Sequence, residues 1–364
     1  MLTLHVIQAA FGDCLLLEAG TAKDKRHLLI DGGPPGTYAA NLKPVLHNLA
    51  KVSDHLDLVI LSHVDNDHIV GLLDFFAELR ESKDTGTKAL IGVDALWHNS
   101  FSDTVDPDDV IAPRLAAAIS SANMSVMSST DIAVLGVNEG RSLRIAATAL
   151  GVPMNAKFSK SLISVDTAGA PRMVGPLTIT VVGPTAKNLE ALRKEWIAWL
   201  DKHEDALSDP AVAAAADRSV PNLSSIVLLL EAAGKRILLT GDARGDHIVQ
   251  GLEQAGQLEE GKMHLDVLKL PHHGSERNIT RGFFESITAD TYVVSADGRY
   301  DNPDLNTLLW IVDVAEEQGR EITIVATNAP KPVIDLTKKR PPAKHGYTLT
   351  VLDAGEHSIP VVLA

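Results

Sequence analysis

The chain has 364 residues, 45% of them hydrophobic and 22% charged, which is the composition of a globular protein with room for a substantial core. Its formal net charge of −14 argues against a protein that binds nucleic acid without sequence preference, because such proteins present a basic face. Cys14 is the single cysteine, so the chain can form no internal disulfide and no cysteine-based zinc site.

The first six residues lack the basic segment and the long apolar core of a signal peptide, so we interpret them as the start of a first strand. No apolar stretch approaches the about 20 residues that span a bilayer. We therefore expect a soluble, cytoplasmic protein with no membrane partner.

The first half of the chain alternates short apolar strands with helices. In order, we expect a strand pair at 2–8 and 14–18, a strand at 27–30, a helix at 38–51, a buried strand at 56–60 with a helix after it, a strand within 88–97, helices at 107–122 and 139–150, and strands at 161–166 and 177–183.

Residues 185–217 are polar and helical, and they interrupt this alternation. It then resumes with strands at 225–231, 236–239, 267–270, 291–294 and 322–326, helices at 245–256 and 304–318, and a closing strand pair at 347–353 and 358–363. The pattern predicts two sheets packed face to face with helices outside.

The densest group of chemically active side chains lies at 61–71, where a buried strand runs into a helix. Within six residues the chain carries His63, Asp65, Asp67 and His68. The ends of strands are where an α/β protein normally places its chemistry. Nitrogen and oxygen ligands at this spacing predict a divalent-metal site.

Three further strand ends carry groups that can bind metal. Asp31 precedes a Gly-Gly pair, Asp242 follows Thr-Gly, and His272 and His273 stand together before Gly-Ser. Strand ends on one edge of packed sheets can converge, so these groups and the cluster at 63–68 could form one two-metal site.

Each of these carboxylates also has a structural interpretation. Asp67 and Asp242 can cap the helices that follow them, and Asp31 can organise a turn. We interpret Asp67 and Asp242 as ligands and Asp31 as a residue that supports the site.

Other polar residues flank the expected site, and two interpretations of them stay open. His98 ends a strand and is either a pocket residue or an ordinary surface histidine. Asn222, Ser225 and Ser275 either line the pocket near the substrate or bond the backbone in turns.

Together these motifs resemble the metallo-β-lactamase fold, whose second motif reads His-x-His-x-Asp-His. Here Asp65 stands at the second histidine. With Thr-Gly-Asp and His-His-Gly-Ser downstream, this variant is most similar to the hydrolase domain of the DNA-uptake protein ComEC and its stand-alone relatives. Further matching segments span nearly the whole chain, at 11–14, 30–33, 222–230, 238–243 and 295–303.

The resemblance implies an α+β fold, a four-layer αββα sandwich. It implies a single domain over residues 1–364, made of two αββα halves at about 1–170 and 171–364, with a helical excursion at about 185–217.

The resemblance also implies a site for two divalent metal ions. One ion would use His63 and Asp65, and the other Asp67 and His68. Asp242 would bridge them, and either or both of His272 and His273 would complete the shells. Zn²⁺ is the usual ion of the family. Mn²⁺ is the alternative, because Asp65 enriches the shell in oxygen and no histidine lies between His98 and His203 to supply the family's third motif.

The implied activity is hydrolysis by a hydroxide that the two metals share, with Asp67 and His273 as catalytic residues and His273 as the proton donor. We expect a phosphodiester or nucleic-acid-like substrate, by analogy with the relatives that share Asp65. Hydrolysis of a lactone, thioester or β-lactam is the alternative, which the missing third-motif histidine disfavours. A metal-binding scaffold or sensor without turnover also stays open.

Overall fold

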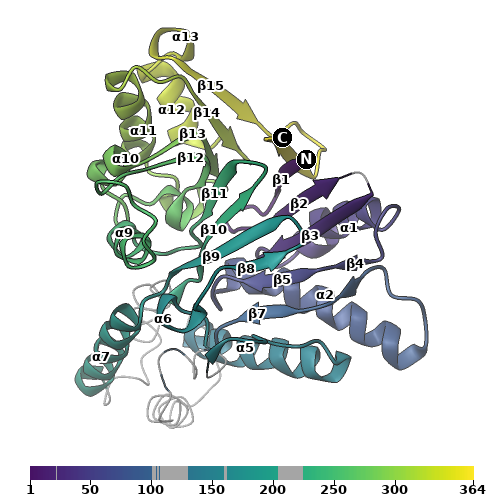
Figure 1. The fold of residues 1–364 in the computed structure, drawn as a ribbon. Coiled ribbons are helices and arrows are strands. Elements are labelled where there is room, and N and C mark those ends of the chain that lie inside the picture. The colour runs from purple at the N-terminus through teal and green to yellow at the C-terminus, as the bar shows by residue number, and fades with distance from the viewer. Residues whose placement is uncertain (22, 101–103, 105, 107–129, 160–161, 204–223) are drawn as a thin grey trace.

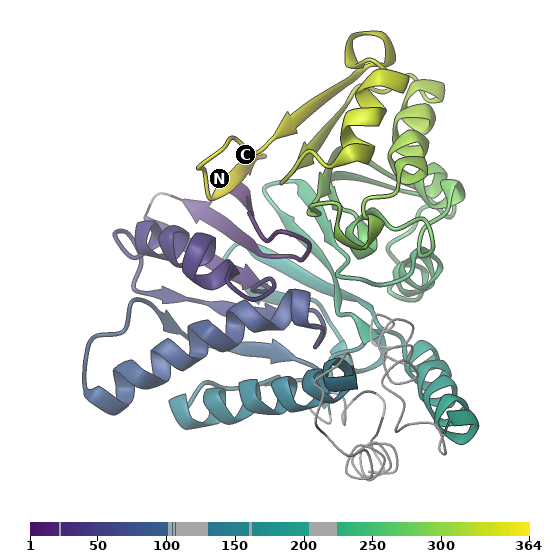
Figure 2. The same cartoon turned by 180° about the vertical axis from the view of Figure 1, so that it is seen from behind.

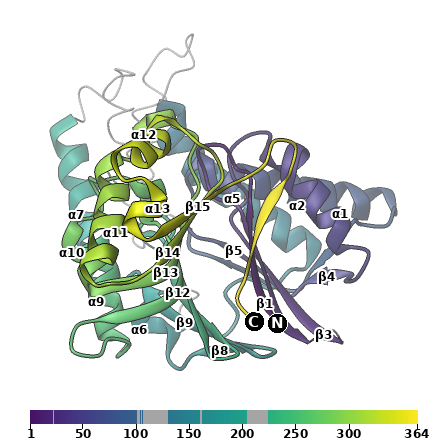
Figure 3. The same cartoon turned by 90° about the horizontal axis from the view of Figure 1, so that it is seen from above.

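The computed structural model describes the chain except for residues 22, 101–103, 105, 107–129, 160–161 and 204–223. Two β-sheets pack face to face, and helices cover both outer surfaces (Figures 1 and 3). This four-layer αββα arrangement is the one that the sequence pattern predicts. Among the described residues, no helix combines the length and the apolar character that crossing a bilayer requires.

The first sheet is built from the N-terminal part of the chain and closed by its last strand. Its strands, in spatial order, are β16 (Ser358–Val362), β1 (Leu2–Ile7), β2 (Leu15–Thr21), β3 (Asp24–Ile30), β5 (Leu58–Leu61) and β7 (Leu96–His98). The strands β3, β5 and β7 run parallel, so their carboxyl ends share one edge. Two short parallel strands, β4 (His55–Leu56) and β6 (Gly92–Val93), form a separate two-stranded sheet.

Helices cover the outer face of this sheet, and Figure 2 shows α2 and α5 side by side across it. These elements are the π-helical turn η1 (Tyr38–Leu42), α1 (Lys43–Leu49), α2 (Asn66–Thr85) and α5 (Thr130–Leu150). Leu29 and Leu61 from the strands belong to the same buried apolar cluster as Phe75 and Phe76 of α2.

The second sheet follows from β8 onwards. Its strands, in spatial order, are β15 (Tyr347–Val351), β14 (Ile322–Ala326), β13 (Ile287–Val294), β12 (Met263–Lys269), β11 (Lys235–Leu239), β10 (Val227–Ala232), β9 (Leu177–Gly183) and β8 (Arg172–Val174). The five strands from β11 to β15 are parallel.

The helices of the second half are α6 (Val165–Ala168), α7 (Ala186–His203), α9 (Gly245–Gln254), α10 (Arg281–Ser286), α11 (Leu305–Glu317), α12 (Lys331–Lys339) and α13 (Pro342–His345). Of these, α9 to α12 contribute Ile248, Phe284, Ile311 and Leu336 to an apolar layer on the outer face of the second sheet.

The layer between the sheets follows from strand alternation. Leu4, Leu17 and Leu28 point inward from the first sheet, and Leu228 and Val267 point inward from the second. The adjacent residues Leu16 and Leu29 point to the helices instead. Alternate faces of a strand therefore serve two different cores.

The structure corrects two expected elements. The strands near the C-terminus do not pair with each other, because β15 joins β14 in the second sheet whereas β16 joins β1 in the first. A strand was expected at 161–166, but the described residues 162–166 form none: Ser164 caps the short helix α6, accepting a hydrogen bond from the Thr167 backbone. The helix expected at 107–122 lies outside the described residues, and so does the part of 185–217 beyond α7.

The turn after β3 approaches α2 at a contact between two glycines. A methyl group added at Gly71 would lie 1.9 Å from the Gly32 carbonyl oxygen, and one added at Gly32 would lie 2.2 Å from the Leu72 nitrogen. The Gly71 N–H also donates to the Gly33 carbonyl at 3.0 Å. This contact holds the first turns of α2 against the end of β3.

Gly71→Ala should therefore lower the free energy of unfolding by about 1–3 kcal/mol, because the helix must move away from the turn. Denaturant titration of the metal-free protein measures this loss. Gly282→Ala is the matched control, since its nearest neighbour would be 3.8 Å away and its stability should not fall. Equal effects of both substitutions would contradict the steric explanation.

Candidate metal centre

The carboxyl edges of the two sheets meet at a buried group of histidines and aspartates. The first sheet brings Asp31 after β3 and His63 after β5, and the start of α2 adds Asp67 and His68. The second sheet brings Asp242 after β11. The residues expected as ligands that the structure brings together are His63, Asp65, Asp67, His68, Asp242, His272 and His273.

Asp31 orients His68. The Nδ1 atom of His68 lies 2.8 Å from Asp31 Oδ2, and it must donate because a carboxylate only accepts. Asp31 also accepts from the backbone and the hydroxyl of Ser62, both at 2.7 Å. These bonds leave the Nε2 lone pair of His68 directed at Asp242.

Backbone and hydroxyl groups orient the other two imidazoles in the same way. The Nδ1 atom of His273 donates to the Ser295 carbonyl at 2.9 Å. The Ser62 hydroxyl gives its hydrogen to Asp31, so His63 Nδ1 donates to the Ser62 oxygen at 3.0 Å. With Nδ1 held by these partners, each ring turns its Nε2 atom to the opposite side, which is the orientation in which imidazoles bind metal.

The Nε2 atoms converge on the Asp242 carboxylate. The Nε2 atom of His68 lies 3.3 Å from Asp242 Oδ1, whereas the Nε2 atoms of His273 and His63 lie 3.4 and 3.9 Å from Oδ2. The Asp67 carboxylate lies 3.2 Å from His273 Nε2, and Asp65 lies 3.5 Å from His63 Nε2.

Five atoms of this group are enclosed without a hydrogen-bond partner: Nε2 of His63, His68 and His273, and Oδ1 of Asp13 and Asp242. Buried polar atoms are normally satisfied, so several together indicate a missing shared partner. Ligand atoms of Asp13, His68, Asp242 and His273 lie within 4.8 Å of one another, as do those of His63, Asp67 and His68. The donor set fits divalent metal ions.

Asp242 is held in place through its own backbone. Its N–H donates to Ser225 Oγ at 3.1 Å, and the preceding Gly241 carbonyl accepts from the His272 N–H at 3.1 Å. Ser225 therefore supports the loop that carries Asp242. Its side chain bonds the backbone, which is the second of the two interpretations given for it above.

The His-His pair occupies the turn η5 (Pro271–Gly274), and both residues have left-handed backbone, with φ of 46° and 54°. Non-glycine residues seldom adopt this conformation, which clusters at functional sites. His273 is buried, whereas the His272 side chain is 24% exposed with Nε2 3.7 Å from Asp242 Oδ2. Both histidines thus face the Asp242 carboxylate, but His273 is buried and His272 is partly exposed to solvent.

The remaining predicted residues lie at different places. His98 is buried at the end of β7, beside the end of β5, so the interpretation as a surface histidine is wrong. Ser275 is buried just after η5, where its N–H donates to the His272 carbonyl. Asn222 lies outside the described residues.

The expectation from sequence overlooked two charged residues, Asp13 and Lys269. Lys269 is 1% exposed, and its ammonium contacts the Asp13 carboxylate, which is equally buried. A lysine within the apolar run Leu268–Leu270, directly before the histidine pair, was the signal in the sequence.

The electrostatics of the metal-free site are those of strongly coupled buried charges. Burial alone would raise the pKa of Asp242, but His273, His68 and His272 lower it well below its usual range. Burial alone would lower the pKa of His68, but Asp242, Asp67 and Asp31 raise it well above its usual range. Without metal, these carboxylates therefore favour a proton on the His68 imidazole.

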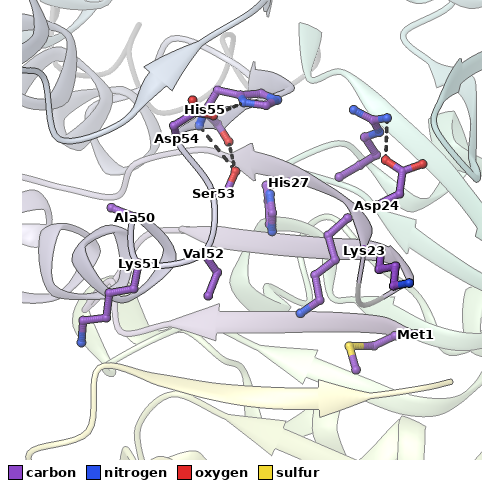
Figure 4. A pocket seen from close by; sticks show the side chains of 12 residues that line it. Met1, Lys23, Asp24, His27, Ala50, Lys51, Val52, Ser53, Asp54 and His55 are labelled. Atoms are coloured by element: carbon purple, nitrogen blue, oxygen red, sulfur yellow. Dashed lines mark hydrogen bonds and ion pairs between the residues drawn. The ribbon is translucent and has the colours of Figure 1, made fainter.

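A cavity of about 690 Å³ lies at the opposite edge of the first sheet, around the amino end of β3 (Figure 4). Figure 4 shows His27 between the 50–55 segment and Lys23. Several of its charged side chains form ion pairs, such as Arg26 with Asp24 at 2.7 Å. None of the residues that line it belongs to the group around Asp242, so this cavity is separate from the metal centre.

Near that cavity, His55, Asp57 and Asp94 form another group with metal-binding side chains. Asp57 accepts from Arg26 at 3.1 Å and from the His27 backbone at 2.8 Å. The group is more exposed than the centre around Asp242, and we interpret it as an ion-pair network.

Comparison with known proteins addresses the fold. Residues 8–84 match the sequence model of the Metallo-beta-lactamase superfamily, a stretch that contains Asp31, His63 and His68 but neither Asp242 nor the His-His pair. No curated protein matches the chain.

Solved structures with a similar fold have low sequence identity. A protein from Parabacteroides distasonis described as a metal-dependent hydrolase is 11% identical, with 89% of this chain and 92% of that chain covered and a TM-score of 0.38. Zn²⁺-bound PqqB from Methylobacterium extorquens is 11% identical, with both chains fully covered and a TM-score of 0.38.

The diiron β-hydroxylase CmlA from Streptomyces venezuelae is 12% identical, with all of this chain and 54% of that chain covered and a TM-score of 0.43. At these values, none of the three structures informs the activity of this chain.

The superfamily match and the four-layer arrangement identify the metallo-β-lactamase fold that the motifs predict. The narrower similarity to ComEC stays a prediction from the sequence.

Glu139, on α5, is a half-buried carboxyl near Asp65. Burial, and secondly the charge of Asp65, raises the pKa of Glu139 from 4.5 to about 7. The folded protein therefore binds a proton more tightly than the unfolded chain does. The resulting stabilisation is present below pH 4.5 and is lost as the pH rises through about 7.

Glu139→Gln removes this titration, so in metal-free protein the variant should gain stability relative to the parent between pH 5 and pH 8. Denaturant titrations at these two pH values measure the difference. A difference that does not change with pH would contradict the raised pKa.

Proposed function

We propose that this chain is a dinuclear metal-dependent hydrolase that acts on phosphodiesters. The observation that carries the proposal is the convergence of the enclosed Nε2 atoms of His63, His68 and His273 on Asp242, without hydrogen-bond partners. A site that only stabilised the fold would pair these atoms with one another or with the backbone.

The donor atoms divide into two sets around Asp242. His63 and Asp65 would hold one ion, because Asp65 faces the Nε2 atom of His63. Asp67, His68 and His273 would hold the other. Asp242 would serve both ions, since Oδ1 faces His68 while Oδ2 faces His63 and His273.

The charge of the site favours two ions over one. Five carboxylates surround the site, those of Asp13, Asp31, Asp65, Asp67 and Asp242. Among the described residues, the ammonium buried next to them is that of Lys269. Their charges leave an excess of four negative charges, which two divalent ions would neutralise. Asp65 and Asp67 are partly exposed and the other three are buried, where uncompensated charge is strongly unfavourable, so one ion would leave the site unbalanced.

Two bound divalent ions would polarise an oxygen of the substrate and lower the pKa of a bound water molecule. The chain's own residues then have separate tasks. His273 is enclosed and tied to Ser295, so we assign it to metal binding rather than to the proton transfer expected from sequence. His272 is partly exposed, and burial, its largest influence, lowers its pKa, so a neutral imidazole is available to move a proton.

The composition of the ligand set supports a phosphodiester substrate. Asp65 supplies oxygen where the family motif has an imidazole, and the sequence has no third-motif histidine. Carboxylate-rich shells suit harder ions such as Mn²⁺, and paired metals are a recurrent arrangement for in-line displacement at phosphorus. The similarity to ComEC-type domains supports the same substrate class by analogy.

Metal analysis followed by a substrate panel tests this proposal. Protein loaded with Mn²⁺ or Zn²⁺ should hold two ions per chain and hydrolyse bis-p-nitrophenyl phosphate or single-stranded DNA faster than a lactone. If neither metal reaches two ions per chain, the dinuclear site is refuted. Two ions with preferred lactone cleavage would refute the substrate, and two ions without turnover would indicate a scaffold.

Asp242→Asn should reduce both metal content and turnover, the latter by at least about 100-fold, because both ions share this carboxylate. Asp246→Asn is the matched control: Asp246 pairs with Arg244 on the surface, so metal content and rate should stay at the parent level. Parent-like activity of Asp242→Asn would show that this carboxylate is not the shared ligand.

A further inference from the structure

Lys269 places a permanent positive charge beside a cation-binding site. It ends β12 between Leu268 and Leu270, which are fully buried, and its own side chain is 1% exposed. A buried ammonium requires anionic or carbonyl partners. The identity of those partners determines whether Lys269 assists or obstructs metal binding.

The ammonium has three oxygen neighbours. It contacts the Asp13 carboxylate directly and donates to the Gly241 carbonyl at 3.2 Å. Its Nζ atom lies 3.9 Å from Asp242 Oδ1, the oxygen that also faces His68 Nε2. Lys269 therefore lies between Asp13 and Asp242, with its close ion pair on the Asp13 side.

The orientation of Asp13 argues against a direct role as a metal ligand. Its carboxylate lies 3.5 Å from Nδ1 of His273 and 3.9 Å from Nδ1 of His68. These are the rear nitrogens, which already donate to Ser295 and Asp31, and the metal-facing Nε2 atoms point to Asp242. Asp13 thus lies behind both imidazoles.

An ammonium ion and a divalent ion compete for the same carboxylate oxygen. If Asp13 lost its charge, Asp242 would be the nearest remaining carboxylate to Lys269, and a short movement of Nζ would pair them. The resulting ion pair would occupy the oxygen that the metals need, and would weaken metal binding without removing a ligand.

We propose that Asp13 is a positioning residue that holds the Lys269 ammonium away from Asp242 and so keeps this carboxylate available to the metal ions. The inference rests on the proposed metal site. It predicts that the damage caused by neutralising Asp13 is reversed by neutralising Lys269 as well, which a metal ligand or a purely structural residue would not show.

The test is a double-mutant cycle read out as Mn²⁺ and Zn²⁺ affinity by calorimetry, together with the number of ions per chain. Asp13→Asn should weaken binding by about 10–100-fold, the usual effect of residues that support metal ligands. Asp13→Asn combined with Lys269→Gln should bind at least about tenfold more tightly than Asp13→Asn alone. Both amides keep their hydrogen-bonding capacity, so shape is preserved while both charges are removed.

Asp266→Asn is the matched control. The Asp266 carboxylate lies 2.7 Å from the Lys235 ammonium, and this pair is outside the metal centre, so the metal affinity of the variant should equal that of the parent. Melting in the presence of chelator reports the fold of every variant. If Asp13→Asn does not fold, Lys269→Gln alone decides, since the proposal requires it to bind metal as tightly as the parent.

Three outcomes distinguish the two proposals. If the parent protein binds no metal, the proposed function fails. If the parent binds two ions and the double variant binds as weakly as Asp13→Asn, the role of Asp13 as a positioning residue is overturned and the metal site stands. A loss of about tenfold or more in Lys269→Gln would likewise overturn it.

Discussion

The imidazole of His68 connects the two sheets at the centre of the site. Its Nδ1 atom lies 2.8 Å from Asp31 at the end of β3, and its Nε2 atom lies 3.3 Å from Asp242 at the end of β11. The position of this ring depends on α2, which approaches the first sheet where Gly71 contacts Gly32 without side chains. The other ligands take their places around the carboxylate that His68 faces.

Buried charge is the second constraint on the site. Without cations, the raised pKa of His68 and the lowered pKa of Asp242 mean that the imidazole keeps its protons while the carboxylate is ionised. Divalent ions would replace those protons, so metal binding and proton release are coupled. Lys269 adds a cation that cannot leave, and its pairing with Asp13 determines how much of Asp242 remains for metal.

The fold and much of the candidate site could be predicted because both depend on local pattern. Apolar runs revealed the strands, and parallel strands share an edge, so Asp31, His63 and Asp242 were expected together. The Asp13–Lys269 ion pair could not be predicted from the sequence, because it joins the two halves of the chain and neither residue stands in a ligand motif. The pairing of β15 and β16 with different sheets is likewise a tertiary choice, which two similar apolar strands do not encode locally. Burial of His98 depends on neighbouring elements in the same way.

The central claim is that two divalent ions share Asp242. The most direct measurement is an anomalous-difference map from crystals grown with Mn²⁺ or Zn²⁺ and collected at the metal edge. The account predicts two peaks, one beside His63 and Asp65 and one beside Asp67, His68 and His273, with Asp242 in contact with both. A single peak, two peaks of which Asp242 touches at most one, or peaks confined to the group of His55, Asp57 and Asp94 would contradict it.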